Sequence, residues 1–426
     1  MDLTPLWREK GLNYVKALKC RECGKLYPPT ARFICEECFG PLDVIYDYNG
    51  IELDKNSFKD RERTLWRYKE LLPISRESYI IDLGAGYTPL HKAKKLAKLL
   101  GLKELYIKDD TVNPTYSFKD RPASVAVSKA LEFGYEAVGC ASTGNLAAAT
   151  AAHATKADLP CYVLIPENIE LNKVIQAVAY GANIIAVKGT YDDANLLAFQ
   201  VANTYNWAIV NVNIRPYYVE GSKTLAFEVC EQLGWKAPDQ VIVPMASGAL
   251  LNAVCKGFEE FRKVGLIENS QVKVIGAQAD GCAPIVNAFK SGNNGVVPVE
   301  KPCTIAKSLV IGDPGDGIYA LRRMKETRGV AESASDQEIV NAIKLLAKTE
   351  GVFTEPAGAV TIAVLKKLVE QGFTSLDDLT VCYVTGNGLK TPGVISGQLR
   401  KPIIIEPKLE QLEEILGGEK VWEVEK

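Results

Sequence analysis

The stretch ELYIKDDTVNPTYSFKDRPASVAVSKALEFG, residues 104–134, contains the change of pattern that decides the fold class. It begins with an apolar run of strand length and ends with the apolar spacing of a helix. Asn113-Pro114 ends the strand, and Pro122 lies in the first helical turn, where its missing N–H costs nothing. The stretch therefore predicts a strand–loop–helix unit with Lys119 near the start of the helix.

Lys119 stands where a lysine can be made nucleophilic. The positive end of a helix dipole disfavours an ammonium ion and so favours the neutral amine. A neutral amine can form a covalent bond with a carbonyl group, whereas a solvated lysine needs no such setting. A single lysine after a phenylalanine is more often an ordinary surface residue, so the interpretation depends on other loops.

Similar units of a strand followed by a helix recur along the chain. The pairs are AVGCAS with GNLAAATAAHATKA, PCYVLIP with NKVIQAVAYG, NIIAVKG with TYDDANLLAFQVANTY, and QVIVPMA with SGALLNAVCKGFEEF, and VKVIGAQA and LTVCYVTG are further expected strands. Continuous Val/Ile runs separated by helices are typical of parallel sheets covered on both faces. In such sheets ligands bind at the loops that follow the strands.

Two of these loops are suited to anions. In ASTGNLAAATAA (141–152), Ser142, Thr143 and Asn145 lie at a helix start, whose free N–H groups suit a carboxylate or phosphate. An ordinary N-cap is the alternative. In PMASGALLNA (244–253), small residues between strand and helix predict a backbone cradle for one phosphate, or else tight helix–sheet packing. The cradle residues are Ala246, Ser247, Gly248, Ala249 and Leu250.

A fourth loop, CYVTGNGLKT (382–391), has Thr385 at a strand end, followed by two glycines that flank Asn387. The four loops together provide a lysine, a phosphate cradle, an anion-binding helix start and a hydroxyl group. A phosphorylated aldehyde cofactor requires this set of groups.

The segments NPTYSFKDR, CASTGNLAAATAAHA, YVEGSKTLAFEV, TEPAGAVTIAV and YVTGNGLKT, in this order, resemble the fold-type II pyridoxal-phosphate enzymes. From about residue 18 to residue 395 the chain is most similar to the threonine synthase family. The lysine motif is shared with serine and threonine dehydratases, whereas VTGNGLK and the cysteine-bearing N-terminus resemble threonine synthases more specifically. The resemblance implies an α/β fold like that of tryptophan synthase β. It also implies a carbon–oxygen lyase of threonine biosynthesis, which converts O-phosphohomoserine and water to threonine and phosphate.

The resemblance also implies roles for the loop residues. Lys119 would be the Schiff-base lysine, Asn145 would bind the phenolic oxygen of the cofactor, and Thr385 would face its pyridine nitrogen. The segment 246–250 would cradle the cofactor phosphate, and Ser142 with Thr143 would hold the substrate carboxylate. The candidates for binding the phosphate that leaves the substrate are Ser117, Lys173, Arg215 and Lys223.

One segment departs from the family pattern. In NVNIRPYYVEGSKT, Tyr218 takes the position where many relatives have arginine, and Arg215 lies three residues earlier. Arg215 would reach the same phosphate with its bidentate guanidinium group. Otherwise the substrate carries a different group, and the chain is a cysteate synthase or a threonine or serine dehydratase. A non-catalytic homologue is the alternative from another class.

The chain has eleven cysteines, of which Cys20, Cys23, Cys35 and Cys38 form two Cys-x-x-Cys knuckles. Two knuckles, each with a nearby glycine, resemble a zinc ribbon, because four thiolates satisfy tetrahedral zinc. The alternatives are reduced thiols without metal, or a redox pair.

Two smaller motifs each have a simple interpretation. Glu355 in TEPAGA is expected to border the active site, and the GDPGDG loop (312–317) is expected to be a turn rather than a cation site.

A length of 426 residues predicts two or three domains. The expected segments are a zinc-ribbon-like part (1–48), a large domain (49–120 and 206–400), a small domain (121–205) and a helical tail (401–426), with residues 49–80 helical. A formal charge of −2 gives no reason to expect a nucleic-acid or membrane partner. Without a membrane-length apolar run or a signal peptide, the expected location is the cytoplasm. The family resemblance adds a homodimer.

Overall fold

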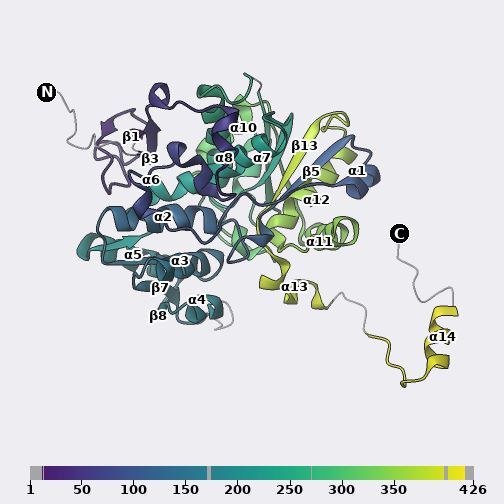
Figure 1. Ribbon diagram of the computed structural model, residues 1–426. Helices are drawn as coiled ribbons and strands as arrows, with labels where there is room; N and C mark the ends of the chain where they lie inside the picture. The colour runs from purple at the N-terminus through teal and green to yellow at the C-terminus, as the bar shows by residue number, and fades with distance from the viewer. Residues whose placement is uncertain (1–11, 13, 170–173, 270, 398–401, 418–426) are drawn as a thin grey trace. The chain divides into compact units, whose positions relative to one another are not determined.

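The computed structural model describes residues 12, 14–169, 174–269, 271–397 and 402–417 (Figure 1). The chain forms two compact units, Met1–Thr391 and Pro392–Lys426. The second unit contains α13 (Gly393–Ser396) and α14 (Leu409–Gly417). All the sheets described below belong to the first unit.

The larger sheet has the strand order β12-β11-β10-β13-β5-β4. Its strands are β4 (Leu90–Lys92), β5 (Glu104–Asp109), β10 (Gln240–Pro244), β11 (Lys273–Ala279), β12 (Ala331–Ala334) and β13 (Leu379–Val384). All neighbouring pairs are parallel except β4 with β5. Every residue of β10 is buried, so both faces of the sheet are covered, because successive side chains point to opposite faces.

The smaller sheet has the strand order β8-β7-β6-β9 and is entirely parallel. Its strands are β6 (Ala137–Ala141), β7 (Cys161–Pro166), β8 (Asn183–Val187) and β9 (Trp207–Ile209). The two parallel sheets with intervening helices confirm the predicted α/β fold class. Each strand quoted from the sequence forms within a residue or two of its expected position.

The helices of the first unit follow the expected alternation with strands (Figure 1). They are α1 (Lys94–Leu100), α2 (Asp120–Glu132), α3 (Asn145–Lys156), α4 (Ile175–Ala179), α5 (Tyr191–Thr204), α6 (Arg215–Tyr218), α7 (Thr224–Gln232), α8 (Ala249–Lys263), α9 (Pro284–Lys290), α10 (Gly317–Glu326), α11 (Asp336–Glu350) and α12 (Pro356–Glu370). Helix α12 packs against β10 to β13 of the larger sheet, and α5 packs against the smaller one.

The cysteine-bearing segment forms a three-stranded antiparallel sheet of order β2-β1-β3. Its strands are β1 (Val15–Cys20), β2 (Leu26–Tyr27) and β3 (Leu42–Tyr46). The segment that follows, residues 49–80, was expected to be helical and instead forms short 3-10 turns, such as η3 (Leu65–Leu71). Tertiary contacts outweigh the local pattern here: Trp66, for example, is buried and its Nε1 donates to Ser124 Oγ at 2.9 Å.

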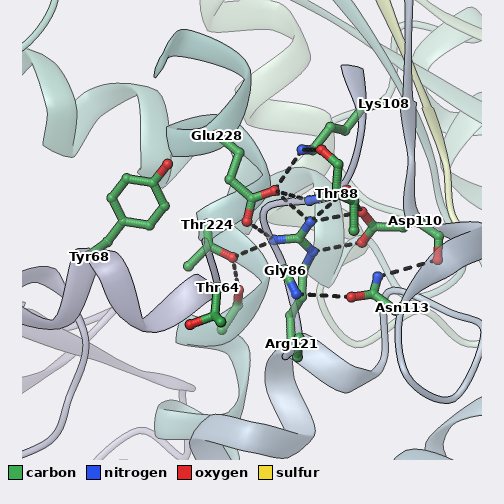
Figure 2. Close-up of polar contacts among 12 residues, drawn as sticks. Thr64, Tyr68, Gly86, Thr88, Lys108, Asp110, Asn113, Arg121, Thr224 and Glu228 are labelled. Carbon is green, nitrogen blue, oxygen red and sulfur yellow. Dashed lines mark hydrogen bonds and ion pairs between the residues drawn. The ribbon is translucent and has the colours of Figure 1, made fainter. Parts of the chain in front are cut away.

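A buried charge cluster anchors the strand–loop–helix unit (Figure 2). The guanidinium of Arg121 in α2 is fully buried and binds the carboxylates of Asp110 and Glu228, with Nη2 at 2.8 Å from each. Lys108 Nζ lies 2.6 Å from Glu228 Oε2. Burial alone would raise the pKa of Glu228, but Arg121 and Lys108 outweigh it and lower that pKa to about 2. The cluster fixes the first turn of α2 through Arg121, two residues beyond Lys119.

Candidate active site

Lys119 lies at the N-cap of α2, as its position in the sequence predicted. Its side chain is half-buried, and Nζ donates to the hydroxyl of Tyr218 at 3.1 Å. The same Nζ lies 4.7 Å from the centroid of the Phe118 ring. The preceding Tyr116 has a φ of 66°, a left-handed conformation that bulky residues rarely adopt. A tight, strained loop therefore presents the lysine amine to an aromatic hydroxyl group.

The Thr385 loop pairs with the Lys119 loop. Phe118 N donates to Thr385 O at 2.9 Å, Asn387 N donates to Tyr116 O at 3.0 Å, and Ser117 forms an antiparallel bridge with Gly386. Strands β5 and β13 are parallel neighbours, so the loops that follow them meet at one edge of the sheet. This pairing places the buried Thr385, the predicted strand-end hydroxyl residue, beside the loop that carries the lysine.

The start of α3 reaches the same place. Asn145 is the first residue of α3, and its Nδ2 donates to Glu355 Oε1 at 2.8 Å. Glu355 in turn donates its backbone N–H to Gly386 O at 2.9 Å, next to Thr385. Ser142 and Thr143, half-buried, come just before α3. Asn145 and Glu355 thus connect the helix of the smaller sheet to the loops of the larger one.

Buried titratable groups surround these loops. Burial raises the pKa of Glu355 to about 7, although Lys390, Asn145 and Lys119 act in the opposite direction. Burial likewise raises the pKa of Asp120 to about 7, against hydrogen bonds from Thr115. Burial lowers the pKa of Lys390, whereas Glu355 and Asp120 raise it. The site therefore contains two carboxyl groups that change protonation near neutral pH.

Lys390 is a residue that the sequence reasoning missed. It ends the short 3-10 turn Gly388–Lys390 after Thr385, and its Nζ donates to Gln176 Oε1 at 2.9 Å. A signal was available, because Lys390 belongs to the same VTGNGLKT loop as Thr385. Two basic groups, Lys119 and Lys390, thus act on the charge of the single carboxylate of Glu355.

The predicted phosphate cradle lies between β10 and the start of α8. Gly248 has a φ of 93°, and a Cβ at this position would lie 2.9 Å from the carbonyl oxygen of Asp316. Asp316 N donates to Ser247 O at 3.1 Å, so the GDPGDG loop packs directly on the cradle. Only glycine fits at position 248 without strain. The first turn of a helix suits a phosphate, and here the N–H of Ala249 donates to Ser247 Oγ at 3.4 Å.

The four candidates for the leaving phosphate lie in different settings. Arg215 begins α6, the helix that also carries Tyr218, and its guanidinium pairs with Asp316. Ser117 is fully buried, and its Oγ has no hydrogen-bond partner among the described residues. Lys173 lies outside the described residues.

Lys223 is not brought to the site. Its Nζ is buried between the carboxylates of Glu220 at 2.5 Å and Glu260 at 2.7 Å. Both carboxylates hold this ammonium in place, and moving it to a substrate phosphate would leave two buried carboxylates with Lys256 as their shared cation. We therefore leave Lys223 out of the proposed site.

The four knuckle cysteines come together. Their sulfur atoms all lie within 4.8 Å of one another, with Sγ–Sγ distances of 3.4 Å from Cys20 to Cys38 and 3.6 Å from Cys23 to Cys35. A tetrahedral zinc with Zn–S bonds of about 2.3 Å separates its sulfur ligands by about 3.8 Å. The donor set and its spacing therefore fit a tetrathiolate metal site.

Comparison with known proteins defines the class to which this site belongs. Residues 81–386 match the family described as "Pyridoxal-phosphate dependent enzyme". Among solved structures, diaminopropionate ammonia lyase from Escherichia coli has a TM-score of 0.62 at 19% identity, covering 80% of this chain and 95% of that chain. Maize serine racemase has a TM-score of 0.61 at 22% identity, covering 73% and 91%. These structures support the fold.

Curated relatives give the narrower family. Threonine synthase from Methanocaldococcus jannaschii is 44% identical over 401 residues, which cover 93% of this chain and 98% of that protein. Threonine synthase from Methanosarcina acetivorans is 41% identical over 403 residues, covering 94% and 98%. The chain therefore belongs to the threonine synthase family of pyridoxal-phosphate-dependent enzymes. Among the described residues, no helix has both the length and the apolar character needed to cross a membrane.

Proposed function

We propose that this protein converts O-phosphohomoserine and water to threonine and phosphate. The observation that carries the proposal is the assembly of Lys119, Asn145 and Thr385 beside a glycine-bearing phosphate cradle, in a chain of this family. The net reaction breaks the bond between the γ carbon and the phosphate oxygen. The β carbon gains a hydroxyl group from water, and the γ carbon becomes a methyl group.

The residues present fit pyridoxal phosphate. The half-buried amine of Lys119, the unpartnered hydroxyl of Ser117 and the Cβ-free position at Gly248 each suit a phosphorylated aldehyde. We propose that Lys119, Asn145, Thr385 and the segment 246–250 hold it. When bound, the cofactor supplies an electron sink for charge that develops on the substrate carbons.

Lys119 is the proposed proton carrier. Its amine would take the α proton and then the β proton of the substrate, which requires a neutral amine. The hydroxyl of Tyr218, 3.1 Å from Nζ, orients the amine at the start of α2. We therefore propose that Tyr218 orients the lysine amine. It would not bind the substrate phosphate, which is the role expected of the arginine that many relatives have at this position.

The remaining polar groups would orient the substrate. The N-terminus of α3, with Ser142 and Thr143, suits the α-carboxylate, because its first N–H groups are free to donate. Arg215, on the same short helix as Tyr218, is the proposed ligand of the substrate phosphate, with Ser117 as a second donor. Glu355 would hold Asn145 in place through their 2.8 Å hydrogen bond.

A spectroscopic and product assay tests this function. The purified protein should show a visible absorption band that shifts when O-phosphohomoserine is added, with release of threonine and phosphate in equal amounts. A band without turnover would point instead to phosphoserine, threonine or serine as the substrate. Absence of a band after addition of pyridoxal phosphate would contradict the assignment of Lys119.

We also propose a structural zinc at the four cysteines, a homodimer, a cytoplasmic location, and a small domain built around the sheet of strands β6 to β9. The sulfur positions support the zinc, and the separate parallel sheet supports the small domain. The homodimer follows from the state that is usual in the family. Light scattering on the holoenzyme at several concentrations tests the homodimer.

A further inference from the structure

Asp316 lies between two arginines from distant parts of the chain. Its side chain is almost fully buried, with 1% of its surface exposed. Arg21, which lies between Cys20 and Cys23 in the first knuckle, places Nη1 3.0 Å from Asp316 Oδ1. Arg215 pairs with the other carboxylate oxygen, Oδ2. One carboxylate is thus shared by the cysteine-bearing sheet and the proposed phosphate ligand.

Arg21 has a second, firm partner that keeps it in place. Its Nε and Nη2 donate to the two carboxylate oxygens of Asp43 at 2.9 and 2.7 Å. Such a bidentate pair fixes the plane of the guanidinium. Arg21 therefore presents its remaining edge to Asp316 whether or not Arg215 is paired there.

The backbone of Asp316 is also held, independently of its carboxylate. Its N–H donates to Ser247 O at 3.1 Å, and its carbonyl oxygen accepts from Asn252 Nδ2 at 3.2 Å. The carbonyl also packs against Gly248 of the cradle. Because these contacts use only the backbone of Asp316, a change of its side-chain charge leaves them in place.

Arg215 is the most exposed of the three side chains. Its side chain is 28% exposed, against 16% for Arg21 and 1% for Asp316. Among the residues that the structure describes it makes one ion pair. It also begins a helix whose fourth residue, Tyr218, contacts Lys119. A guanidinium at this place can leave Asp316 for a phosphate that is bound near the lysine.

We propose that Asp316 is a positioning residue that holds Arg215 in a resting ion pair, from which Arg215 turns to the substrate phosphate. Arg21 weakens this ion pair because it partly neutralises the same carboxylate from its other oxygen and its guanidinium repels that of Arg215. The inference depends on the proposed role of Arg215 as a phosphate ligand. Two substitutions should therefore have opposite effects on phosphate binding. Loss of the Arg21 charge strengthens the resting ion pair and so weakens phosphate binding. Loss of the Asp316 charge abolishes the ion pair and so strengthens phosphate binding.

The test measures the binding of inorganic phosphate to the holoenzyme by calorimetry, together with KM and kcat for O-phosphohomoserine. Arg21→Gln should raise both the phosphate Kd and KM about three- to tenfold, with kcat changed less than about twofold. Asp316→Asn should lower the phosphate Kd by a similar factor. The double variant should behave like Asp316→Asn, because the ion pair that Arg21 weakens is then absent.

Controls separate positioning from folding. Asp313→Asn changes an exposed residue of the same loop and should leave phosphate binding unchanged. Arg21→Lys retains the charge but loses the bidentate geometry, and it should give an intermediate rise in the phosphate Kd. Melting temperatures and cofactor content are compared throughout.

Two outcomes would overturn different statements. If Arg21→Gln and Asp316→Asn both weaken phosphate binding, Asp316 is only structural and the inference fails. If Arg215→Gln leaves phosphate binding and KM unchanged, Arg215 is not the phosphate ligand, and that part of the proposed function fails with it. Production of threonine by the wild-type protein reports on the reaction itself, independently of both.

Discussion

The amine of Lys119 and the hydroxyl of Tyr218 lie 3.1 Å apart, although the two residues are in separate segments of the chain. The sequence comparison placed Tyr218 where an arginine was expected and so raised doubt about the substrate. The structure shows that this side chain points to the lysine amine. We therefore propose that the departure concerns how the lysine is oriented, whereas Arg215 pairs with Asp316.

Removal of this hydroxyl should impair catalysis more than folding. Tyr218→Phe keeps the ring in its buried position and loses only the hydrogen bond to Nζ. We expect kcat to fall about ten- to a hundredfold, with cofactor content unchanged. This is less than the roughly 10²–10⁴-fold of a direct acid–base group, because Tyr218 only orients the lysine. Tyr217→Phe is the matched control, because the Tyr217 hydroxyl donates to Thr30 O in the cysteine-bearing segment. Equal kcat values for the two variants would contradict the assignment.

The cradle should tolerate no side chain at Gly248. Gly248→Ala introduces a Cβ 2.9 Å from Asp316 O on a backbone with a φ of 93°. Either the loop moves or α8 shifts, and we expect the affinity for pyridoxal phosphate to fall about tenfold or more. Fluorescence titration of the cofactor-free protein measures this. Gly315→Ala is the control, since no atom lies within 4 Å of its added Cβ, and unchanged affinity in both variants would place the phosphate elsewhere.

The charge cluster around Arg121 should dominate the stability of the strand–loop–helix unit. Arg121→Met leaves Asp110 and Glu228 buried without their shared partner. Breaking a buried pair in this way costs about 3–5 kcal/mol of unfolding free energy. Chemical denaturation measures the change, with the exposed Arg63→Gln as a control that should lose less than about 0.5 kcal/mol. A similar small loss for both would mean that water reaches the cluster.

Glu355 should make stability depend on pH near neutrality. Its pKa is raised to about 7 from an ordinary value of 4.5, so its contribution to stability is complete below about pH 4.5 and is lost as the pH rises through 7. Glu355→Gln avoids this loss. Relative to the wild type, it should gain on the order of 1–3 kcal/mol between pH 5 and pH 9.

Denaturation midpoints at the two pH values measure the gain for Glu355→Gln. The exposed Glu136→Gln variant is expected to follow the wild type at both values. A Glu355→Gln variant that follows the wild type as well would show that Glu355 is ionised in the folded protein throughout this range.

The cysteine cluster should contain metal. Elemental analysis of the purified holoenzyme should find about one zinc per chain. Cys38→Ser should lose it and lower the melting temperature, because one of four thiolates is missing. Cys303→Ser, which changes an exposed cysteine outside the cluster, should retain the zinc. Protein that is free of metal and melts at the same temperature as the zinc-loaded form would show that the thiols need no ion.

Local patterns were sufficient to predict most of the fold and the centre of the site. Strand and helix periodicities repeat within a few residues, so the strands and the start of α2 could be recognised directly. Because the carboxyl ends of parallel strands meet at one edge of a sheet, the loops that follow them could be grouped from the amino-acid sequence alone. Lys119, Asn145 and Thr385 were grouped in this way, and the structure brings their loops together.

Tertiary structure alone decided which charged and polar groups are free to act. The sequence presents Lys223 and Arg215 as equivalent basic residues. In the structure, Lys223 is enclosed by the carboxylates of Glu220 and Glu260. Arg215 instead shares the carboxylate of Asp316 with Arg21. Likewise, residues 49–80 form 3-10 turns because their side chains pack on distant elements. Periodicity is a local property that one segment carries by itself. Ion pairs and hydrogen bonds join residues far apart in the chain, so only the folded arrangement specifies them.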